Sequence, residues 1–398
     1  MKVTKFMKGG MAAVMAMTLA ACSSGSNGGD SGSTASGALK IGGSGPLSGD
    51  AAVYGTAVKN GASLAIKEIN ASDDYTVKFS DLDFQDDEAD TEKAVTAFNQ
   101  LLSDGIQVSI GTTTSGSGQA VSQLYKDNDI FAITPSGSSP AIIYQDAENE
   151  KDPYGNVFQM CFTDPNQGTA SADYISEHKL GSKIAIIYRN DDNYSSGIYK
   201  TFMNEAEKKK LNVVYEGTFQ DGATDYSVQV KAAKDAGADL VFLPIYYQPA
   251  YQILTEAKKQ DYAPTFFGCD GMDGILTMKG VDPADVEGLY MLTPYSADST
   301  DEKSAAFTKA YKDEYGETPN QFAADAYDAV YAIAQACDEG KVTADMATSD
   351  ITATLVKEFT SMTFSGVTGS NVTWNKNGEV TKDPRAIVIK DGKYVSAE

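Results

Sequence analysis

The 398-residue sequence has few of the residues that most catalytic and metal sites use. It contains one histidine, one tryptophan and four cysteines. Basic residues are also scarce, since 32 Lys and Arg stand against 55 Asp and Glu, which gives a formal net charge of −23. A nucleic-acid-binding protein needs a basic surface for the phosphates, so this charge excludes nucleic acid as a partner. These shortages favour binding of a small molecule over catalysis, with no cofactor and no metal.

Long apolar runs are absent as well. Residues 11–19 are apolar behind a lysine-containing start, but they are too few to span a bilayer, which takes about 20 residues. This arrangement predicts a signal peptide over residues 1–21. Leu-Ala-Ala-Cys at residues 19–22 resembles the lipobox of bacterial lipoproteins, so we expect Cys22 to carry a lipid and residues 22–37, rich in Ser and Gly, to form a flexible tether. The alternative is an ordinary signal peptide in which Cys22 has no role.

Three cysteines follow the tether. Cys161 and Cys337 lie in apolar contexts and are interpreted as small buried residues. Because three is odd, they cannot all pair within the chain, and a disulfide between two of Cys161, Cys269 and Cys337 stays open.

Short apolar runs alternate with segments of helical periodicity from residue 39 onward. The first series predicts strands at 39–43, 77–84, 108–111 and 131–134, and helices at 55–70, 90–102 and 119–127. The second series predicts strands at 183–188, 213–216, 240–244 and 265–268, and helices at 166–178, 197–210, 226–236 and 250–260. This rhythm indicates an α/β protein with two Rossmann-like lobes, each a mostly parallel sheet covered by helices.

The tail departs from this rhythm. It predicts strands at 289–293 and 385–390 and helices at 303–315, 323–338 and 349–360. A chain that completes both lobes after visiting each must cross between them more than once, which is typical of a hinge.

Catalytic and metal sites find little support. His178 lies late in a charged helix and is interpreted as a surface residue. No nucleophile elbow and no phosphate-binding loop occurs in the required form. A secreted hydrolase that uses Ser115 or Ser138 would need an activating base near these serines. The acidic residues Asp81, Asp83, Asp86 and Asp87 lack the glycine and terminal glutamate of a calcium loop, which leaves a weak calcium site as a minor alternative.

The loops that follow the predicted strands are the most informative segments. Residues 42–49, 111–118 and 134–140 offer hydroxyls, backbone N–H groups and a following helix start, which together suit a small anion. In the second half, residues 245–247 bring two tyrosines, and Asp270 lies between strand and glycine, where it could face an ammonium group. In parallel sheets, ligands bind beyond the carboxyl ends of the strands. An anion site on one lobe and a carboxylate on the other predict an α-amino acid as the ligand.

These segments resemble the branched-chain amino-acid-binding proteins of ABC importers. The similarity runs in order from about residue 39 to 395, and it rests on the following residues: Leu39 to Gly49, Tyr54-Gly55, Gly61-Ala62, Ile69-Asn70, Phe84 to Asp87, Ile110-Gly111, Ile133 to Pro135 and Thr373-Trp374. The resemblance implies a periplasmic binding protein of type I with three crossovers between its lobes, near residues 163, 295 and 364. It assigns residues 38–162 and 296–364 to the first lobe, and 163–295 and 365–398 to the second.

The resemblance also implies the site residues. Ser115, Ser136 and Ser138 would hold the ligand carboxylate, Asp270 would hold the ammonium, and Tyr54, Tyr194 and Tyr246 would line the cleft. Two departures stand out: the leucine-type binders have Glu where Asp270 stands, and the paired cysteines of some members match Ala89 or its neighbours and Thr114 here, so that disulfide is absent.

The expected function is therefore that of a lipid-anchored extracytoplasmic receptor. It would bind leucine, isoleucine or valine as a monomer and deliver the amino acid to ABC permease subunits with their ATPases. Sensor subunits and binders of other amino acids or small amides share the fold, so these alternatives stay open.

Overall fold

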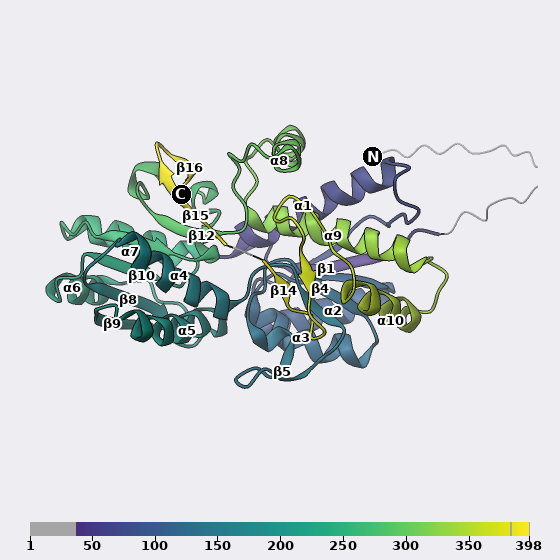
Figure 1. The fold of residues 1–398 in the computed structure, drawn as a ribbon, viewed down its shortest axis with the longest axis horizontal. Helices are drawn as coiled ribbons and strands as arrows, with labels where there is room; N and C mark the ends of the chain where they lie inside the picture. The colour runs from purple at the N-terminus through teal and green to yellow at the C-terminus, as the bar shows by residue number, and fades with distance from the viewer. Residues whose placement is uncertain (1–36, 383, 398) are drawn as a thin grey trace, which may run out of the picture. The chain divides into compact units, whose positions relative to one another are not determined.

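The computed structural model describes residues 37–382 and 384–397 (Figure 1). The predicted signal peptide and Cys22 lie outside these residues. Among the helices of this part of the chain, none is both long and apolar enough to cross a membrane.

A five-stranded sheet with the order β2-β1-β3-β4-β7 forms the centre of the first lobe, and all neighbouring strands are parallel. Its strands are β1 (Ile41–Gly45), β2 (Asp83–Asp86), β3 (Val108–Thr112), β4 (Phe131–Thr134) and β7 (Val157–Gln159). One face packs against α1 (Ala52–Ala71), α9 (Gln321–Gly340) and α10 (Thr348–Phe359), and the other against α2 (Thr91–Asp104) and α3 (Ser115–Asp127). The helix α8 (Glu302–Tyr315) packs against α1.

A seven-stranded sheet with the order β16-β15-β12-β11-β10-β8-β9 forms the centre of the second lobe. Its strands are β8 (Ile184–Arg189), β9 (Val213–Phe219), β10 (Leu240–Leu243), β11 (Thr265–Gly268), β12 (Tyr290–Thr293), β15 (Arg385–Lys390) and β16 (Lys393–Ser396). In this sheet β15 runs antiparallel to both of its neighbours, β12 and β16, and the other neighbouring strands are parallel. The prediction of two mostly parallel α/β lobes is confirmed.

Alternating side chains of β8 explain why both faces of this sheet are covered. Ile184 and Ile186 pack with α4 (Asp164–His178) and α5 (Asn193–Lys209). Ala185 and Ile187 point to the opposite face, where α6 (Ser227–Asp235) and α7 (Tyr247–Lys259) lie. The first four residues of β8 are apolar and buried, so the strand needs cover on both sides, and the two helix pairs provide it.

The chain crosses between the lobes three times: from β7 to α4, from β12 to α8, and from β14 (Val380–Thr381) to β15. The third crossing lies later than the predicted position near residue 364. The hairpin of β13 (Thr373–Trp374) and β14 is held to the first lobe, because Trp374 Nε1 donates a hydrogen bond of 2.7 Å to the Gln159 carbonyl. The Lys382 ammonium is buried and donates to Asp325 of α9, which fixes the end of this segment before it crosses.

The predicted strand at 77–84 is displaced in the structure. Leu39 pairs with Phe79 only as an isolated bridge, and the ladder resumes where Gly42 faces Asp83. Three residues separate Phe79 from Asp83, whereas two separate Leu39 from Gly42. The extra residue interrupts the ladder as a bulge does. Ser80 Oγ accepts the Ile41 N–H at 3.3 Å, so a side chain replaces the missing backbone partner.

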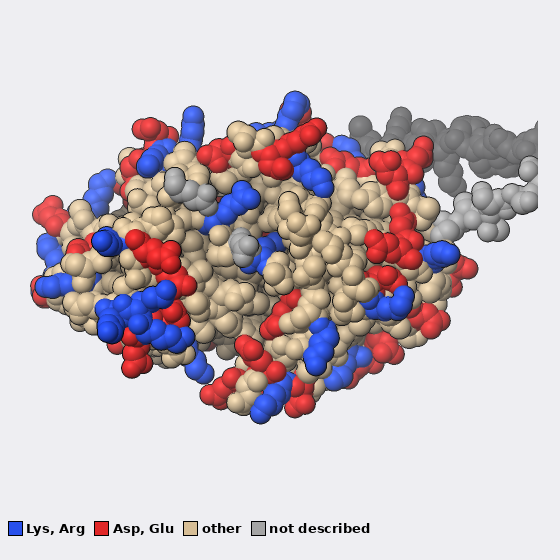
Figure 2. All heavy atoms as spheres, in the orientation of Figure 1, with Lys and Arg blue, Asp and Glu red and all other residues tan. Residues whose placement is uncertain are grey.

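Charged side chains of both signs are interspersed over the face that Figure 2 shows. Most ion pairs between them are exposed, such as Lys231 with Asp235, and such pairs contribute little to stability. The Lys382–Asp325 pair differs, because both side chains are almost fully buried. His178 is exposed and stacks on Tyr174, with 4.0 Å between the ring centroids, as expected for a surface residue.

The three cysteines of the described chain are buried and free. The interpretation of Cys161 and Cys337 as small buried residues is confirmed, and Cys269 is also buried and free.

Two further short hairpin strands, β5 (Tyr144–Asp146) and β6 (Lys151–Pro153), pair with each other outside the main sheets.

Candidate functional site

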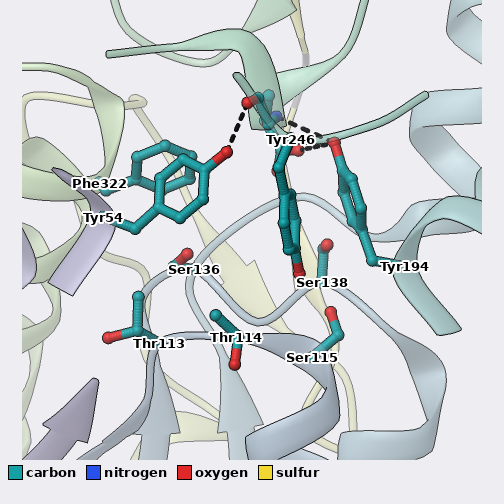
Figure 3. Close-up of a pocket in the computed structure, with 11 residues that line it drawn as sticks. Tyr54, Thr113, Thr114, Ser115, Ser136, Ser138, Tyr194, Tyr246 and Phe322 are labelled. Carbon is teal, nitrogen blue, oxygen red and sulfur yellow. Dashed lines mark hydrogen bonds between the residues drawn. The ribbon is translucent and has the colours of Figure 1, made fainter. Parts of the chain in front are cut away.

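A cavity lies where loops of both lobes meet. Its lining contains all seven residues predicted for the site, together with Thr113, Thr114, Gly271 and Phe322. The seven are Tyr54, Ser115, Ser136, Ser138, Tyr194, Tyr246 and Asp270. Figure 3 shows the hydroxyl side chains of the first lobe on one side of the cavity and the tyrosines above them. The structure thus brings together segments that are far apart in the sequence.

The first-lobe side of the cavity begins at the carboxyl end of β3. Thr113 and Thr114 follow this strand, and Ser115 is the first residue of α3. The side chain of the N-cap residue Thr114 makes no capping hydrogen bond to the helix. The first backbone N–H groups of a helix have no partner within it, so these donors are available to an anion beside Ser115.

The loop after β4 supplies Ser136 and Ser138, and two buried side chains fix its shape. Thr134 Oγ1 accepts the Gly137 N–H at 2.8 Å and donates to the Thr112 carbonyl at 2.8 Å. Gln159 Nε2 donates to the Gly137 carbonyl at 3.0 Å and to the Ser139 carbonyl at 3.1 Å. The backbone of this loop is therefore held in place from β3 and from β7.

The second-lobe side of the cavity is built around Asp270, which follows β11 and is 2% exposed. Its Oδ1 accepts a hydrogen bond of 2.7 Å from the Tyr194 hydroxyl, and its Oδ2 accepts one of 2.8 Å from Gln167 Nε2. Burial raises the pKa of Asp270 to about 7, and these hydrogen bonds lower it in part. The carboxylate is thus oriented by the protein, and its ionisation falls near neutral pH.

Tyr54 of α1 joins the two lobes across the cavity. Its hydroxyl donates to the Gly271 carbonyl at 2.6 Å and accepts the Tyr247 N–H at 3.1 Å. The Tyr54 ring makes edge contacts with Tyr246 and Phe322, at centroid distances of 5.3 Å and 4.9 Å. In Figure 3 the Tyr246 side chain reaches down between Tyr54 and Tyr194 toward Ser138. Aromatic faces therefore bound the middle of the cavity, and polar groups lie at its two ends.

Asp164 is a neighbouring residue that the sequence reasoning missed. It is the first residue of α4, it is fully buried, and its N–H donates a hydrogen bond of 3.0 Å to the carbonyl of Ser138, in the loop that lines the cavity. Its position between Thr163 and Pro165 is typical of a helix start, which gave it an ordinary structural interpretation. Phe322 was also missed, because an aromatic residue early in a helix carries no sign of a cleft.

The cavity does not resemble a hydrolytic site. Asp270 is the one carboxylate of its lining, which contains no His, Lys or Arg. Ser115 Oγ accepts a hydrogen bond of 3.3 Å from the Ser139 N–H, and no side chain positioned as a base contacts it among the described residues. His178 lies at the exposed end of α4.

Two of the four acidic residues that suggested a calcium alternative, Asp86 and Asp87, serve as hydrogen-bond acceptors. Asp86 accepts from the Leu47 N–H and the Ser48 hydroxyl, and Asp87 accepts from the Ser44 hydroxyl. Within residues 37–382 and 384–397, no group of three or more acidic, His or Cys side chains is arranged to hold a metal ion.

Comparison with known proteins identifies what the chain is similar to. Residues 38–393 match the family model described as periplasmic binding protein. A Leu/Ile/Val-binding protein homologue of Brucella suis is 30% identical over 298 residues, which cover 73% of this chain and 76% of that protein. The Leu/Ile/Val-binding protein of Escherichia coli is 28% identical over 260 residues, covering 65% and 68% of the two chains.

A solved structure extends the similarity to three dimensions. The substrate-binding protein of a branched-chain amino-acid transporter from Streptococcus pneumoniae, in complex with isoleucine, superposes with a TM-score of 0.79. It is 27% identical, and the match covers 91% of this chain and 99% of that one.

Proposed function

The chain belongs to the periplasmic binding protein family, and from this premise we propose that it captures leucine, isoleucine or valine between its lobes for import. In this proposal it delivers the amino acid to the permease subunits of an ABC importer, whose ATPases supply the work. Membership of the family gives it an extracytoplasmic binding role. The names of its relatives in Brucella suis and Escherichia coli support the ligand class.

The observation that carries the proposal is the division of polar groups between the two ends of the cavity. The first lobe offers hydroxyls and the first backbone N–H groups of α3, with Ser115 among the residues there. The second lobe offers the buried carboxylate of Asp270. An α-amino acid carries a carboxylate and an ammonium on one carbon, and these two ends match its charges.

The aromatic residues suit the remainder of a branched-chain amino acid. Tyr54, Tyr246 and Phe322 offer ring faces and edges between the polar ends. Burying a Leu, Ile or Val side chain against such surface contributes about 1.5–3 kcal/mol.

Ligand binding is coupled to lobe closure in this proposal. Tyr54 of the first lobe already bonds to Gly271 and Tyr247 of the second, so these groups form part of the interface of the closed state. A ligand that contacts both lobes binds the closed state better than the open one and shifts the population toward it.

The N-terminal segment gives the receptor its place in the cell. We propose that export leaves Cys22 as a lipid-bearing first residue and that residues 23–37 tether the folded body to the membrane. Mass spectrometry of the membrane-extracted protein tests the lipid anchor, because a diacylated Cys22 peptide is expected and an unmodified one contradicts the anchor. In this proposal the receptor acts as a monomer.

The test of the ligand is a stability panel followed by calorimetry. The full chain in mild detergent is stripped of resident ligand by unfolding and refolding, then heated with each of the twenty amino acids, small amides and simple sugars. A ligand at about 100 times its Kd should add about 2.7 kcal/mol of stability. A shift confined to leucine, isoleucine and valine supports the proposal. If another amino acid raises the thermal stability instead, the protein is specific for that amino acid. If only other compounds raise it, the proposal of a site for a zwitterion is overturned.

A further inference from the structure

The turn that carries Asp270 is bonded to both lobes. Within the second lobe, Gln167 of α4 donates from Nε2 to Asp270 Oδ2 at 2.8 Å, and its Oε1 accepts the Asp270 N–H at 3.2 Å. From the first lobe, Gln321 at the start of α9 donates from Nε2 to the Asp270 carbonyl at 3.3 Å. Both glutamines are almost fully buried, and neither lines the cavity. Two amides, one from each lobe, therefore hold Asp270 from behind the site.

A second hydrogen bond joins the same turn to the start of α9. Asp273 is buried, its Oδ2 accepts the Gln321 N–H at 2.8 Å, and its Oδ1 accepts the Gly274 N–H at 2.8 Å. A carboxylate at a helix N-terminus satisfies a backbone donor that has no partner within the helix, and the helix dipole favours its charge. The turn is thus attached to the first lobe through both the side chain and the backbone of Gln321.

Close packing leaves little freedom between this turn and the first lobe. Gly274 has a φ of 95°, and a Cβ there would lie 2.6 Å from Val53 Cγ1 and 3.1 Å from Asn320 Nδ2. Glycine is the residue that combines this backbone conformation with so close an approach. The Tyr54 hydroxyl adds a further hydrogen bond from the first lobe, of 2.6 Å, to the Gly271 carbonyl. The turn is therefore fitted to the first lobe along its whole length.

The proposed ligand explains why this fit matters. An α-amino acid carries its ammonium and its carboxylate on one carbon, so the distance between the two charges is fixed. In the proposed function the carboxylate binds at Ser115 in the first lobe, and the ammonium binds at Asp270 in the second. Gln167 and Tyr194 fix Asp270 relative to its own lobe alone. Gln321 is bonded to Asp270 itself and fixes it relative to the lobe that contains Ser115.

We propose that Gln321 is a positioning residue of the amino-acid site, which aligns Asp270 with the first lobe and so completes the acceptor for the ligand ammonium only in the closed state. The inference rests on the proposed function. When the lobes separate, the bonds from Gln321 to Asp270 and Asp273 break, and Asp270 keeps only its second-lobe partners. A ligand that engages Asp270 then favours the same closed state that Gln321 stabilises, which couples recognition to closure.

The experiment compares l-leucine with 4-methylpentanoate, which lacks the ammonium group. Both are titrated calorimetrically into the full chain in mild detergent, as wild type and as Gln321→Leu, which removes the amide but keeps the backbone N–H and most of the side-chain volume. We expect the affinity for leucine to fall by about 2- to 10-fold relative to that for 4-methylpentanoate, the value of one hydrogen bond. A loss of packing alone lowers both affinities alike and leaves their ratio unchanged.

Gln335→Leu is the matched control, because Gln335 lies on the same helix and both partners of its amide are in the first lobe. Its Nε2 donates to Glu339 Oε1 at 2.8 Å and to the Thr363 carbonyl at 3.2 Å. The ratio of the two affinities in this variant should equal that of the wild type. A ratio that falls as far in Gln335→Leu as in Gln321→Leu overturns the assignment of Gln321.

A second variant keeps the test decisive if Gln321→Leu does not fold. Gln321→Asn retains an amide and the backbone N–H, but its side chain is one methylene shorter, which withdraws the donor from the Asp270 carbonyl. We expect the ratio of the two affinities to fall by a similar factor. An unchanged ratio in this folded variant contradicts the proposal.

The outcomes separate this inference from the proposed function. A wild type that binds leucine, with a Gln321→Leu variant of unchanged ratio, overturns the role of Gln321 and leaves the proposed function intact. A wild type that binds no amino acid overturns the proposed function itself, and this inference with it. If the panel selects another amino acid, that amino acid and its desamino analogue replace the leucine pair.

Discussion

The two lobes share one architecture and differ in the chemistry that they present to the cavity. Each has a mostly parallel sheet between two layers of helices, and each places cavity residues at the carboxyl ends of its strands. The first lobe contributes hydroxyls at Thr113, Ser115 and Ser138, whereas the second contributes Asp270 and a tyrosine pair. The scaffold therefore fixes where a ligand lies, and the strand-end residues decide which charge each side accepts.

The largest expected effect comes from removing the charge on the second-lobe side. Asp270→Ala should weaken amino-acid binding by about 2–5 kcal/mol, because it removes a buried carboxylate and leaves the Tyr194 hydroxyl and Gln167 amide without their acceptor. Calorimetry with the amino acid identified by the panel measures the loss. Asp270→Asn, which preserves shape, separates the loss of charge from the loss of packing, and unchanged affinity in both variants removes Asp270 from the site.

The pH dependence of binding also reports on the second-lobe side, because Asp270 is the one carboxyl of the cavity lining. Burial raises the pKa of Asp270 to about 7, so below pH 7 this carboxyl must lose a proton before it can accept a cation. Affinity should therefore rise from pH 5 to pH 7, by at most about tenfold per pH unit for this group, and then level off. Heat measurements in two buffers of different ionisation enthalpy should show proton release, and Asp270→Asn should flatten the profile.

The stability of the ligand-free protein should depend on pH in the opposite direction from the ligand affinity. The folded-state pKa of Asp270 lies above its unfolded value, so the contribution of this group to the stability of the ligand-free protein is fully present below about pH 4. It is lost as the pH rises toward 7. A ligand-free protein whose pH profile of stability is the same with and without Asp270→Asn contradicts this assignment.

The packing of the helices should be alike in the two lobes, in contrast to the cavity. A Cβ at Gly61 of α1 would lie 2.0 Å from the Ala323 carbonyl oxygen of α9, and one at Gly168 of α4 would lie 2.6 Å from the Ile198 carbonyl oxygen of α5. Gly61→Ala and Gly168→Ala should each lower the free energy of unfolding by about 1–3 kcal/mol. Denaturant titration measures both.

The control for these glycines is Gly116→Ala, whose Cβ would meet nothing closer than 3.8 Å. Its stability should stay close to that of the wild type. If Gly61→Ala or Gly168→Ala is as stable as Gly116→Ala, the two helices in that lobe lie farther apart than in the structure.

Much of the fold followed from the sequence because its strands are uniformly apolar and its helices are amphipathic. The strand β8 reads as an unbroken apolar run, and the structure covers it on both faces. The bulge between Phe79 and Asp83 was missed, because alternation of Val77 and Phe79 with polar residues is the same in a paired and an unpaired segment. The third crossover was placed too early, because the contacts of Trp374 and Lys382 join residues distant in sequence.

The site was predicted as a set of loops, and the structure shows that several of its residues lie in the first turns of helices. Helix α3 begins at Ser115 instead of 119, and α5 begins at Asn193 instead of 197. Gly and Ser residues in these segments favour turns, which moved the predicted helix starts toward the C-terminus. Asp164 could not be found in this way, since its burial beside Ser138 exists only in the folded chain.

A change at Ser115 tests the first-lobe side of the cavity, where we expect the smallest loss of ligand affinity. Ser115→Ala removes one hydroxyl at the start of α3 but leaves the backbone N–H groups there, so the affinity should fall by about 0.5–1.5 kcal/mol, the value of a single neutral hydrogen bond. Ser122→Ala lies two turns along the same helix, where its hydroxyl donates to the Gly118 carbonyl outside the cavity lining, and should leave affinity unchanged. A loss at Ser115 as large as that at Asp270 would mean that the hydroxyl, and not the helix start, holds the carboxylate. Recognition by the first lobe would then rest on one side chain, as in the second.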